Sequence, residues 1–160
     1  MGQIVIVDTS VFLNILDVPG RNQNRAATFG AFTIHVNAGD HLYLPVPCII
    51  ETGNHISRLR DGHDCYQCAK RFVAEVRNAL NGSSPWQPVP LLPEGKDDWS
   101  GTSGVERWLV DFPNEAQRQV SLTDVTVKDL FTQFCDKFPM STVRVWALDG
   151  HLASLQRLHP

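Results

Sequence analysis

The chain has 160 residues, of which 42% are hydrophobic and 19% are charged, a composition typical of one globular domain with a substantial core. The formal net charge of −3 argues against a strongly basic nucleic-acid binder, although clustered metal-binding acids can lower the net charge of a nuclease. No apolar stretch is long enough to span a bilayer, and the N-terminus lacks the layout of a secretory signal. We therefore expect a cytoplasmic protein without membrane contact.

An apolar strand followed by an acidic residue opens the chain. The run of β-branched residues within 3–7 predicts an interior parallel strand that ends at Asp8. We expect short helical or loop structure over 8–14, a helix over 24–37 and a second strand over 41–45. Pro45-Val46-Pro47 then favours a helix start, which places Glu51 near the first turn, where the helix dipole stabilises an anion.

The second half of the chain alternates in the same way. A helix is expected over 64–80, followed by a long irregular loop over 83–104 that is rich in proline, glycine and serine. Short segments over 106–112 and 114–120 lead to a strong helix, which Ser121 or Thr123 could cap and which runs through Phe138. A strand over 143–148 ends at Asp149, and a short helix closes the chain. The alternation predicts an α/β fold with a mostly parallel sheet, as a single domain over 1–160 with a helical or irregular insertion around 61–120.

Four acidic residues occur at the ends of these predicted elements. Asp8 and Asp149 end strands, whereas Glu51 and Asp124 enter helices. The carboxyl ends of parallel strands and the amino ends of the following helices share one rim of a sheet, so the four side chains can meet. Like charges 4 Å apart repel by about 1 kcal/mol in water and about 4 kcal/mol at an effective dielectric of 20, which favours protonation or a bound cation. Hard divalent ions choose oxygen ligands and support phosphodiester hydrolysis.

Each acid also has an ordinary explanation when taken alone. Asp124 could be a helix cap, Asp149-Gly150 a turn and Glu51 a first-turn acid. The functional prediction therefore depends on their joint occurrence at one sheet rim.

Four segments that contain these acids resemble the PIN-domain nucleases: residues 4–14, 44–54, 120–124 and 145–149. The matching motifs are short and scattered over most of the chain, and the likeness is greatest to VapC-type toxins of type II toxin–antitoxin systems. The resemblance implies a three-layer α/β/α fold and an endoribonuclease that depends on Mg²⁺ or Mn²⁺. The expected partners are an RNA substrate, a small antitoxin protein and a second copy in a homodimer.

The resemblance also implies residue roles. Asp8, Glu51, Asp124 and Asp149 would be the catalytic, metal-binding acids. Thr9 or Ser10 would supply a nearby hydroxyl, and Asn54 would be a supporting polar residue one helical turn after Glu51. If Asp149 is not a ligand, Asp129 is the nearest substitute.

Other side chains suggest RNA contacts less specifically. Arg58, Arg60 and Arg71, together with Lys70 and Arg77, concentrate positive charge that could hold phosphates, or could simply form a solvated helix face. Trp86 and Trp99 in the predicted loop could stack on bases or pin the loop to a surface. Cys65 and Cys68 form a C-x-x-C without a second ligand pair, so we expect ordinary reduced thiols.

Two alternatives to a ribonuclease remain open at this point. One is a non-catalytic RNA- or protein-binding PIN-like module. Ala147, at a position where many relatives carry a hydroxyl, and the long insertion motivate it. The other is a phosphatase acting on small phosphoesters.

Overall fold

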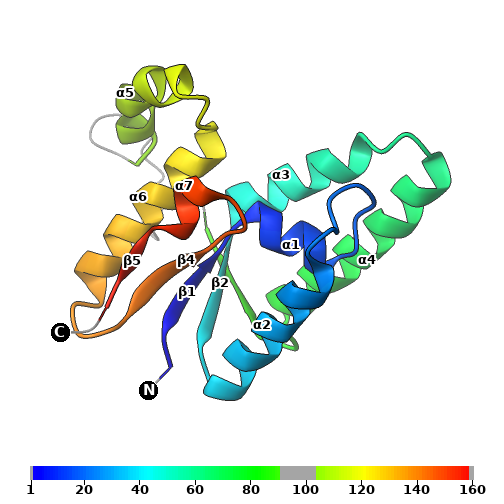
Figure 1. The fold of residues 1–160 in the computed structure, drawn as a ribbon, viewed down its shortest axis with the longest axis horizontal. Coiled ribbons are helices and arrows are strands. Elements are labelled where there is room, and N and C mark those ends of the chain that lie inside the picture. The colour runs from blue at the N-terminus through cyan, green and yellow to red at the C-terminus, as the bar shows by residue number, and fades with distance from the viewer. Residues whose placement is uncertain (1, 91–103, 159–160) are drawn as a thin grey trace.

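A five-stranded sheet forms the centre of the computed structural model, which describes residues 2–90 and 104–158 (Figure 1). The strands are β1 (Ile4–Val7), β2 (His41–Pro45), β3 (Trp86–Val89), β4 (Val143–Trp146) and β5 (Gln156–Arg157), in the spatial order β3-β2-β1-β4-β5. Neighbours from β3 to β4 pair in parallel, and β5 pairs antiparallel with β4. The predicted α/β class with a mostly parallel sheet is confirmed.

Helices cover both faces of this sheet (Figure 1). They are α1 (Thr9–Ile15), α2 (Arg25–Ala38), α3 (Val46–Ser57), α4 (Gly62–Leu80), α5 (Gly104–Gln117), α6 (Leu122–Lys137) and α7 (Gly150–Ala153). Alternate side chains of β1 point to opposite layers. Val5 and Val7 pack with residues of α1 to α4, whereas Ile4 and Ile6 pack with residues of α6 and α7. All four are at most 4% exposed, because a central parallel strand is buried on both faces.

The start of the region predicted as a long loop forms an edge strand, and residues 91–103 of that predicted loop lie outside the described residues. Trp86 begins β3, is 1% exposed, and its ring stacks on Phe32 at 4.9 Å between centroids. Its indole Nε1 donates a hydrogen bond to Glu75 (2.6 Å). Of the two roles considered for Trp86, base stacking is therefore wrong, because the ring is part of the core. Pro88 is compatible with this strand because β3 lies at the sheet edge. Trp99 lies outside the described residues.

Helix α5 also differs from prediction, because it continues through Pro113 where two short segments were expected. Its apolar residues pack on the start of α6: Trp108 lies in a cluster with Val120 and Val125. This packing on α6 outweighs the local helix-breaking preference of proline. The short antiparallel β5 was not predicted either. In the described part of the chain, no helix has both the length and the apolar character needed to cross a bilayer.

Candidate active site

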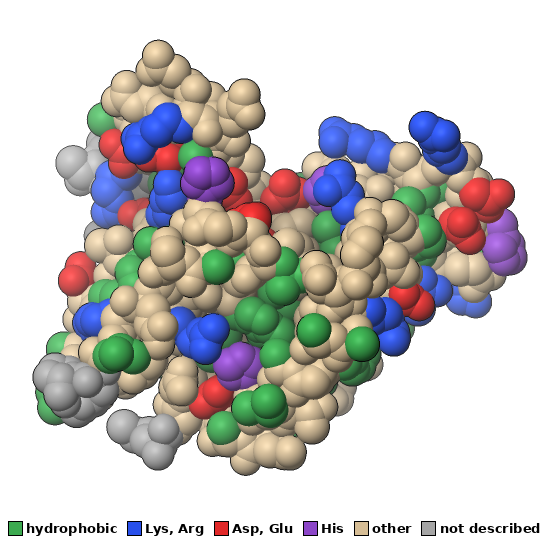
Figure 2. Space-filling model, in the orientation of Figure 1, with side chains coloured by type: hydrophobic (Ala, Val, Ile, Leu, Met, Phe, Trp, Pro, Cys, Tyr) green, Lys and Arg blue, Asp and Glu red, His purple; other side chains and the backbone are tan. Residues whose placement is uncertain are grey.

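A cavity of about 390 Å³ opens at the rim where β1 and β4 end. Its walls include all four acids that the sequence singles out: Asp8, Glu51, Asp124 and Asp149. In Figure 2, acidic side chains gather in the hollow between the block of α5, α6 and α7 and the block of α1 and α3. The structure therefore brings together four carboxylates from segments far apart in the sequence. We call this space the acidic cavity.

Asp8 is the buried member of the set, with 3% of its surface exposed. Its backbone N–H donates to the carbonyl of Trp146 (3.0 Å), which fixes it beside the end of β4. Its Oδ2 accepts hydrogen bonds from the backbone N–H (3.0 Å) and the hydroxyl (2.5 Å) of Ser10, and thereby caps α1.

The surroundings of Asp8 raise its pKa from 3.8 to about 6. Burial is the largest cause; the hydrogen bonds from Ser10 oppose it, and the negative charges of Asp149 and Asp124 add to it. Without a cation, the ionised form of Asp8 is therefore less favourable than that of an exposed aspartate. A divalent cation would reverse this balance by favouring the charged carboxylate.

Two hydroxyls at the start of α1 hold the acids in place. Thr9 Oγ1 donates to Oε2 of Glu51 (2.9 Å), which ties the end of β1 to α3. Ser10 Oγ donates to Asp8 and accepts from the backbone N–H of Leu148 (3.0 Å), which ties the same turn to the segment before Asp149. Thr9 and Ser10 therefore orient carboxylates of the acidic cavity, each by a different route.

The remaining two acids are held differently from one another. Asp124 forms a capping box at the start of α6: its Oδ2 accepts from the backbone N–H of Ser121 (3.2 Å), and its own N–H donates to the Ser121 hydroxyl (3.1 Å). Asp149 occupies the N-cap position of α7, but its exposed carboxylate makes no hydrogen bond within the described chain. Asp149 is accordingly free to reorient.

The carboxylates of the acidic cavity fit a metal ion that keeps water and phosphate ligands, and do not form a complete protein cage. Within residues 2–90 and 104–158, no three His, Cys, Asp or Glu side chains form a group that could hold a metal ion. A preformed all-protein cage is therefore absent from this part of the chain. Mg²⁺ usually keeps several waters and binds through one or two carboxylates plus substrate phosphate. Carboxylates spread around one open cavity suit that second mode.

Further polar side chains that were not predicted as site residues also line the acidic cavity, among them Arg21, Gln23, Asn24 and His55. His55 lies one helical turn after Glu51, and its Nε2 is 4.0 Å from Glu51 Oε1. Burial lowers the pKa of His55, and the positive charge of Arg21 lowers it further. The i,i+4 spacing from Glu51 was a signal for His55. No local signal marked Arg21 or Gln23.

Several predicted supporting residues do not lie at the acidic cavity. Asn54 is exposed and absent from its lining, whereas His55, the next residue, lines it. Arg58 and Arg60 are exposed beyond the end of α3 and do not line the cavity either. The structure thus places none of these three against the acids.

Arg71 was predicted to contact RNA, but its guanidinium is used within the fold. Its Nε donates to the carbonyl of Leu16 and its Nη2 to the carbonyl of Asp17, both at 3.0 Å, and Nη2 also contacts Cys68 Sγ at 3.1 Å. These bonds make Arg71 a brace between α4 and the segment after α1. None of the four cysteines forms a disulfide.

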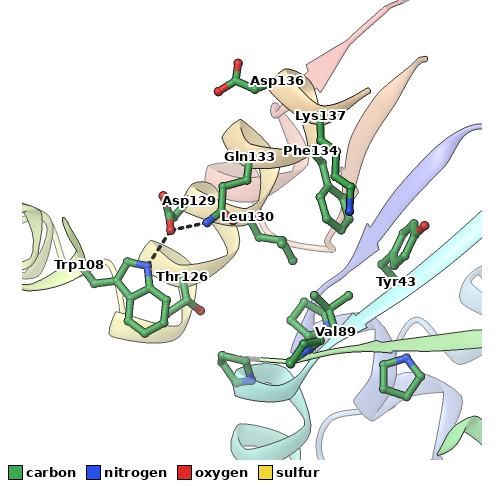
Figure 3. A pocket seen from close by; sticks show the side chains of 14 residues that line it. Tyr43, Val89, Trp108, Thr126, Asp129, Leu130, Gln133, Phe134, Asp136 and Lys137 are labelled. Carbon is green, nitrogen blue, oxygen red and sulfur yellow. Dashed lines mark hydrogen bonds between the residues drawn. The ribbon is translucent and has the colours of Figure 1, made fainter. Parts of the chain in front are cut away.

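A second, larger cavity of about 870 Å³ lies between α6, α5 and the β2–β3 edge of the sheet (Figure 3). Much of its lining is apolar, including Tyr43, Val89, Leu130 and Phe134; we call it the apolar groove. Asp129 lies here, where its Oδ2 accepts hydrogen bonds from Trp108, Gln133 and Arg107 at 2.8–3.1 Å. Asp129 is therefore no substitute for Asp149 at the acidic cavity.

Comparison with protein-family models gives no match, and comparison with curated proteins finds none that is significantly similar to this chain. The function of the acidic cavity therefore has to be argued from its own geometry and chemistry.

Proposed function

We propose that this protein is a divalent-metal-dependent endoribonuclease and that the acidic cavity is its active site. One observation carries the proposal: Asp8, Glu51, Asp124 and Asp149 come from four separate segments and line a single cavity. That cavity lies at the carboxyl ends of parallel strands, where open α/β sheets bind ligands. Clustered carboxylate oxygens are the ligands that Mg²⁺ and Mn²⁺ prefer.

The roles of the residues follow from how each is held. Asp8 and Glu51 would bind the ion, with their orientations fixed by Ser10 and Thr9. Asp124 and the unbonded Asp149 would bind it from the opposite wall, directly or through water. When bound, such an ion lowers the pKa of water and stabilises charge on the phosphate and leaving oxygen.

RNA is the substrate that we propose, and it enters from the sequence resemblance to PIN-domain nucleases. An open cavity at the surface is compatible with a polymer, because the chain can cross the cavity without having to enter it end-first. The narrower proposal, the toxin of a type II toxin–antitoxin pair, also rests on that resemblance. We expect induced expression to arrest growth of a host cell, and Asp8→Asn to relieve the arrest.

A second function, the non-catalytic RNA- or protein-binding module, is favoured by one specific observation. No metal-binding group of three side chains exists among the described residues. Such a module would bind RNA at this surface without cleaving it, and adding Mg²⁺ would not cause cleavage.

The discriminating experiment is cleavage of a 5′-labelled, random-sequence single-stranded RNA by purified protein in Mg²⁺. We expect internal cleavage that a chelator abolishes and that Asp8→Asn slows by at least about 100-fold. Asp136→Asn makes the same charge change on the exposed rim of the apolar groove and should leave the rate unchanged. Equal cleavage by wild type and Asp8→Asn would falsify the proposal, and binding of RNA without any cleavage would favour the module.

A further inference from the structure

The connection between α1 and α2 forms one wall of the acidic cavity. Arg21, Gln23 and Asn24 from this segment, residues 16–24, line the same cavity as the acids. We call it the α1–α2 loop. It therefore places one positive and two neutral hydrogen-bonding side chains beside four carboxylates.

Arg21 is the exposed cation of this wall. Its guanidinium makes no hydrogen bond or ion pair with any residue of the described chain, although carboxylates line the same cavity. It lies near enough to His55 for its charge to lower the pKa of that ring. An arginine carries five donors in a planar fork that matches a phosphate group, and here all five are available.

Neighbouring arginines are already engaged. Arg25 forms an ion pair with Asp17 (3.4 Å) and lies over the ring of Phe29 at 4.6 Å from its centroid. Arg71 donates to two carbonyls, those of Leu16 and Asp17. Arg25 and Arg71 thus support the fold, whereas the guanidinium of Arg21 remains available to a ligand.

The α1–α2 loop is held rigidly at its two ends by Asn14. This residue is 4% exposed; its Nδ2 donates to the carbonyl of Ser10 (2.9 Å), and its Oδ1 accepts from the backbone N–H of Asn24 (3.0 Å). Ser10 in turn binds Asp8. The same chain of hydrogen bonds therefore fixes both the loop and the most buried acid.

The middle of the loop is fixed as well. Val18 is fully buried in the core, and Asn22 Nδ2 donates to Oδ1 of Asp17 (2.7 Å). Asp17 (φ 56°) and Gly20 (φ 76°) adopt left-handed conformations within this loop. A loop that is already ordered loses little entropy when its side chains bind a ligand.

We propose that the α1–α2 loop is the substrate-positioning rim of the acidic cavity, and that Arg21 binds a phosphate of single-stranded RNA next to the one held at the carboxylates. As a claim about cleavage, this inference rests on the proposed function. As a claim about RNA binding, it stands on its own. Gln23 and Asn24 lie beside Arg21 and offer hydrogen bonds to the same strand.

The test compares wild type, Arg21→Ala, Arg21→Lys and Arg77→Ala. The sequence grouped Arg77 with the basic residues that could hold phosphates, but the structure places it outside the lining of the acidic cavity. As an exposed arginine in the last turn of α4, it serves as the matched control. That end of α4 leads into the amino end of parallel strand β3, whereas the acidic cavity lies at the carboxyl ends of the parallel strands. Binding of a fluorescein-labelled random-sequence RNA 20-mer is followed by anisotropy without Mg²⁺, and kcat and KM are measured with Mg²⁺.

We expect Arg21→Ala to raise both Kd and KM by about 10-fold while kcat changes less than about threefold. The slope of log Kd against log salt should fall by about 0.7, the contribution of one phosphate contact to a single strand. Arg21→Lys should restore most of the affinity, because it keeps the charge, and Arg77→Ala should match wild type. Thermal melting should be unchanged in Arg21→Ala, since its side chain makes no hydrogen bond or ion pair with the residues that the structure describes.

The inference would be overturned if Arg21→Ala and Arg77→Ala had equal Kd and KM, even if Asp8→Asn still slowed cleavage. A fall in kcat with Kd and KM unchanged would also overturn it, because Arg21 would then act on the reaction and not on RNA position. If wild type binds but does not cleave, the proposed nuclease fails. In that case the inference that the α1–α2 loop binds RNA holds only if Arg21→Ala weakens RNA binding and Arg77→Ala does not.

Discussion

The acidic cavity and the apolar groove use carboxylates in opposite ways. In the groove, Asp129 accepts three hydrogen bonds, from Trp108, Gln133 and Arg107, so its charge is offset by its neighbours. In the acidic cavity, Asp8 is more deeply buried, its hydrogen-bond donors come from Ser10 alone, and other negative charges lie nearby. The fold balances the first carboxylate by itself and leaves the second dependent on a proton or a cation.

This contrast identifies which acids are structural. A buried carboxylate surrounded by donors stabilises the elements that supply them. A buried carboxylate beside other acids lowers stability unless something binds, and such tension is characteristic of functional sites. Substitutions in each cavity test this contrast.

The largest difference in cleavage rate should be between variants of Asp149 and of Asp129. From the sequence alone, either residue could have been the fourth acid of the site. We expect Asp149→Asn to lower the rate of RNA cleavage by at least about 10-fold, since metal-site groups carry effects of that size or more. Asp129→Asn should change it by less than twofold. Rates for both variants under identical Mg²⁺ conditions give the answer, and a larger loss in Asp129→Asn would invert our assignment of the two cavities.

The next effect concerns the stability of the metal-free protein as pH changes. Because the folded-state pKa of Asp8 is raised from 3.8 to about 6, the folded state binds the proton more tightly than the unfolded state does. The free energy of unfolding that Asp8 contributes is therefore full below about pH 4 and falls as the pH rises through about 6. Its size is roughly 3 kcal/mol, at 1.4 kcal/mol for each pKa unit.

Asp8→Asn should remove this pH dependence. Urea unfolding with chelator present, at pH 4.5 and pH 8, should show wild type losing stability relative to the variant at the higher pH. The variant should be the more stable protein at pH 8, where it avoids a buried, repelled charge. Parallel profiles of unfolding free energy against pH for the two proteins would show that burial does not disfavour the charge of Asp8.

A smaller loss of stability is expected from the groove. Asp129→Ala leaves the indole N–H of Trp108 and the amide of Gln133 without their acceptor, which should cost about 1–3 kcal/mol. The exposed ion pair with Arg107 adds little, because its guanidinium is half exposed. Urea unfolding measures this change, and a loss near zero would mean that these bonds do not support the packing of α5 on α6.

The smallest change touches neither cavity. Gly53 lies within α3, and a Cβ there would meet the Phe72 ring at 3.8 Å, an ordinary contact distance. We expect Gly53→Ala to stabilise the fold by about 0.5–1 kcal/mol and to leave RNA cleavage unchanged. Thermal melting checks the first part. A loss of activity would show that α3 has to bend for the site to work.

The elements that place the acids could be predicted from sequence because their signals are local. The β-branched run before Asp8, the prolines before Glu51 and the cap before Asp124 each predict an element end within a few residues. The parallel sheet then brings these ends to one rim. The acids of the cavity were accessible to sequence reasoning for that reason.

The rest depends on contacts between distant residues. Strand β3 is four residues long and contains a proline, and it is held by Trp86 packing on Phe12 and Phe32 from other elements. Arg21 reaches the cavity because its loop is braced by Arg71, more than 50 residues away. No pattern within either segment carries that information.

The most direct test of the central claim is a calorimetric titration of the metal-free protein with Mn²⁺ at pH 7.5. If the four carboxylates act together as a cation site, wild type and Asp136→Asn should bind Mn²⁺ alike, and Asp8→Asn and Asp124→Asn should each weaken binding by at least about 10-fold. Absence of binding by wild type, or equal affinity in Asp8→Asn and wild type, would contradict the account.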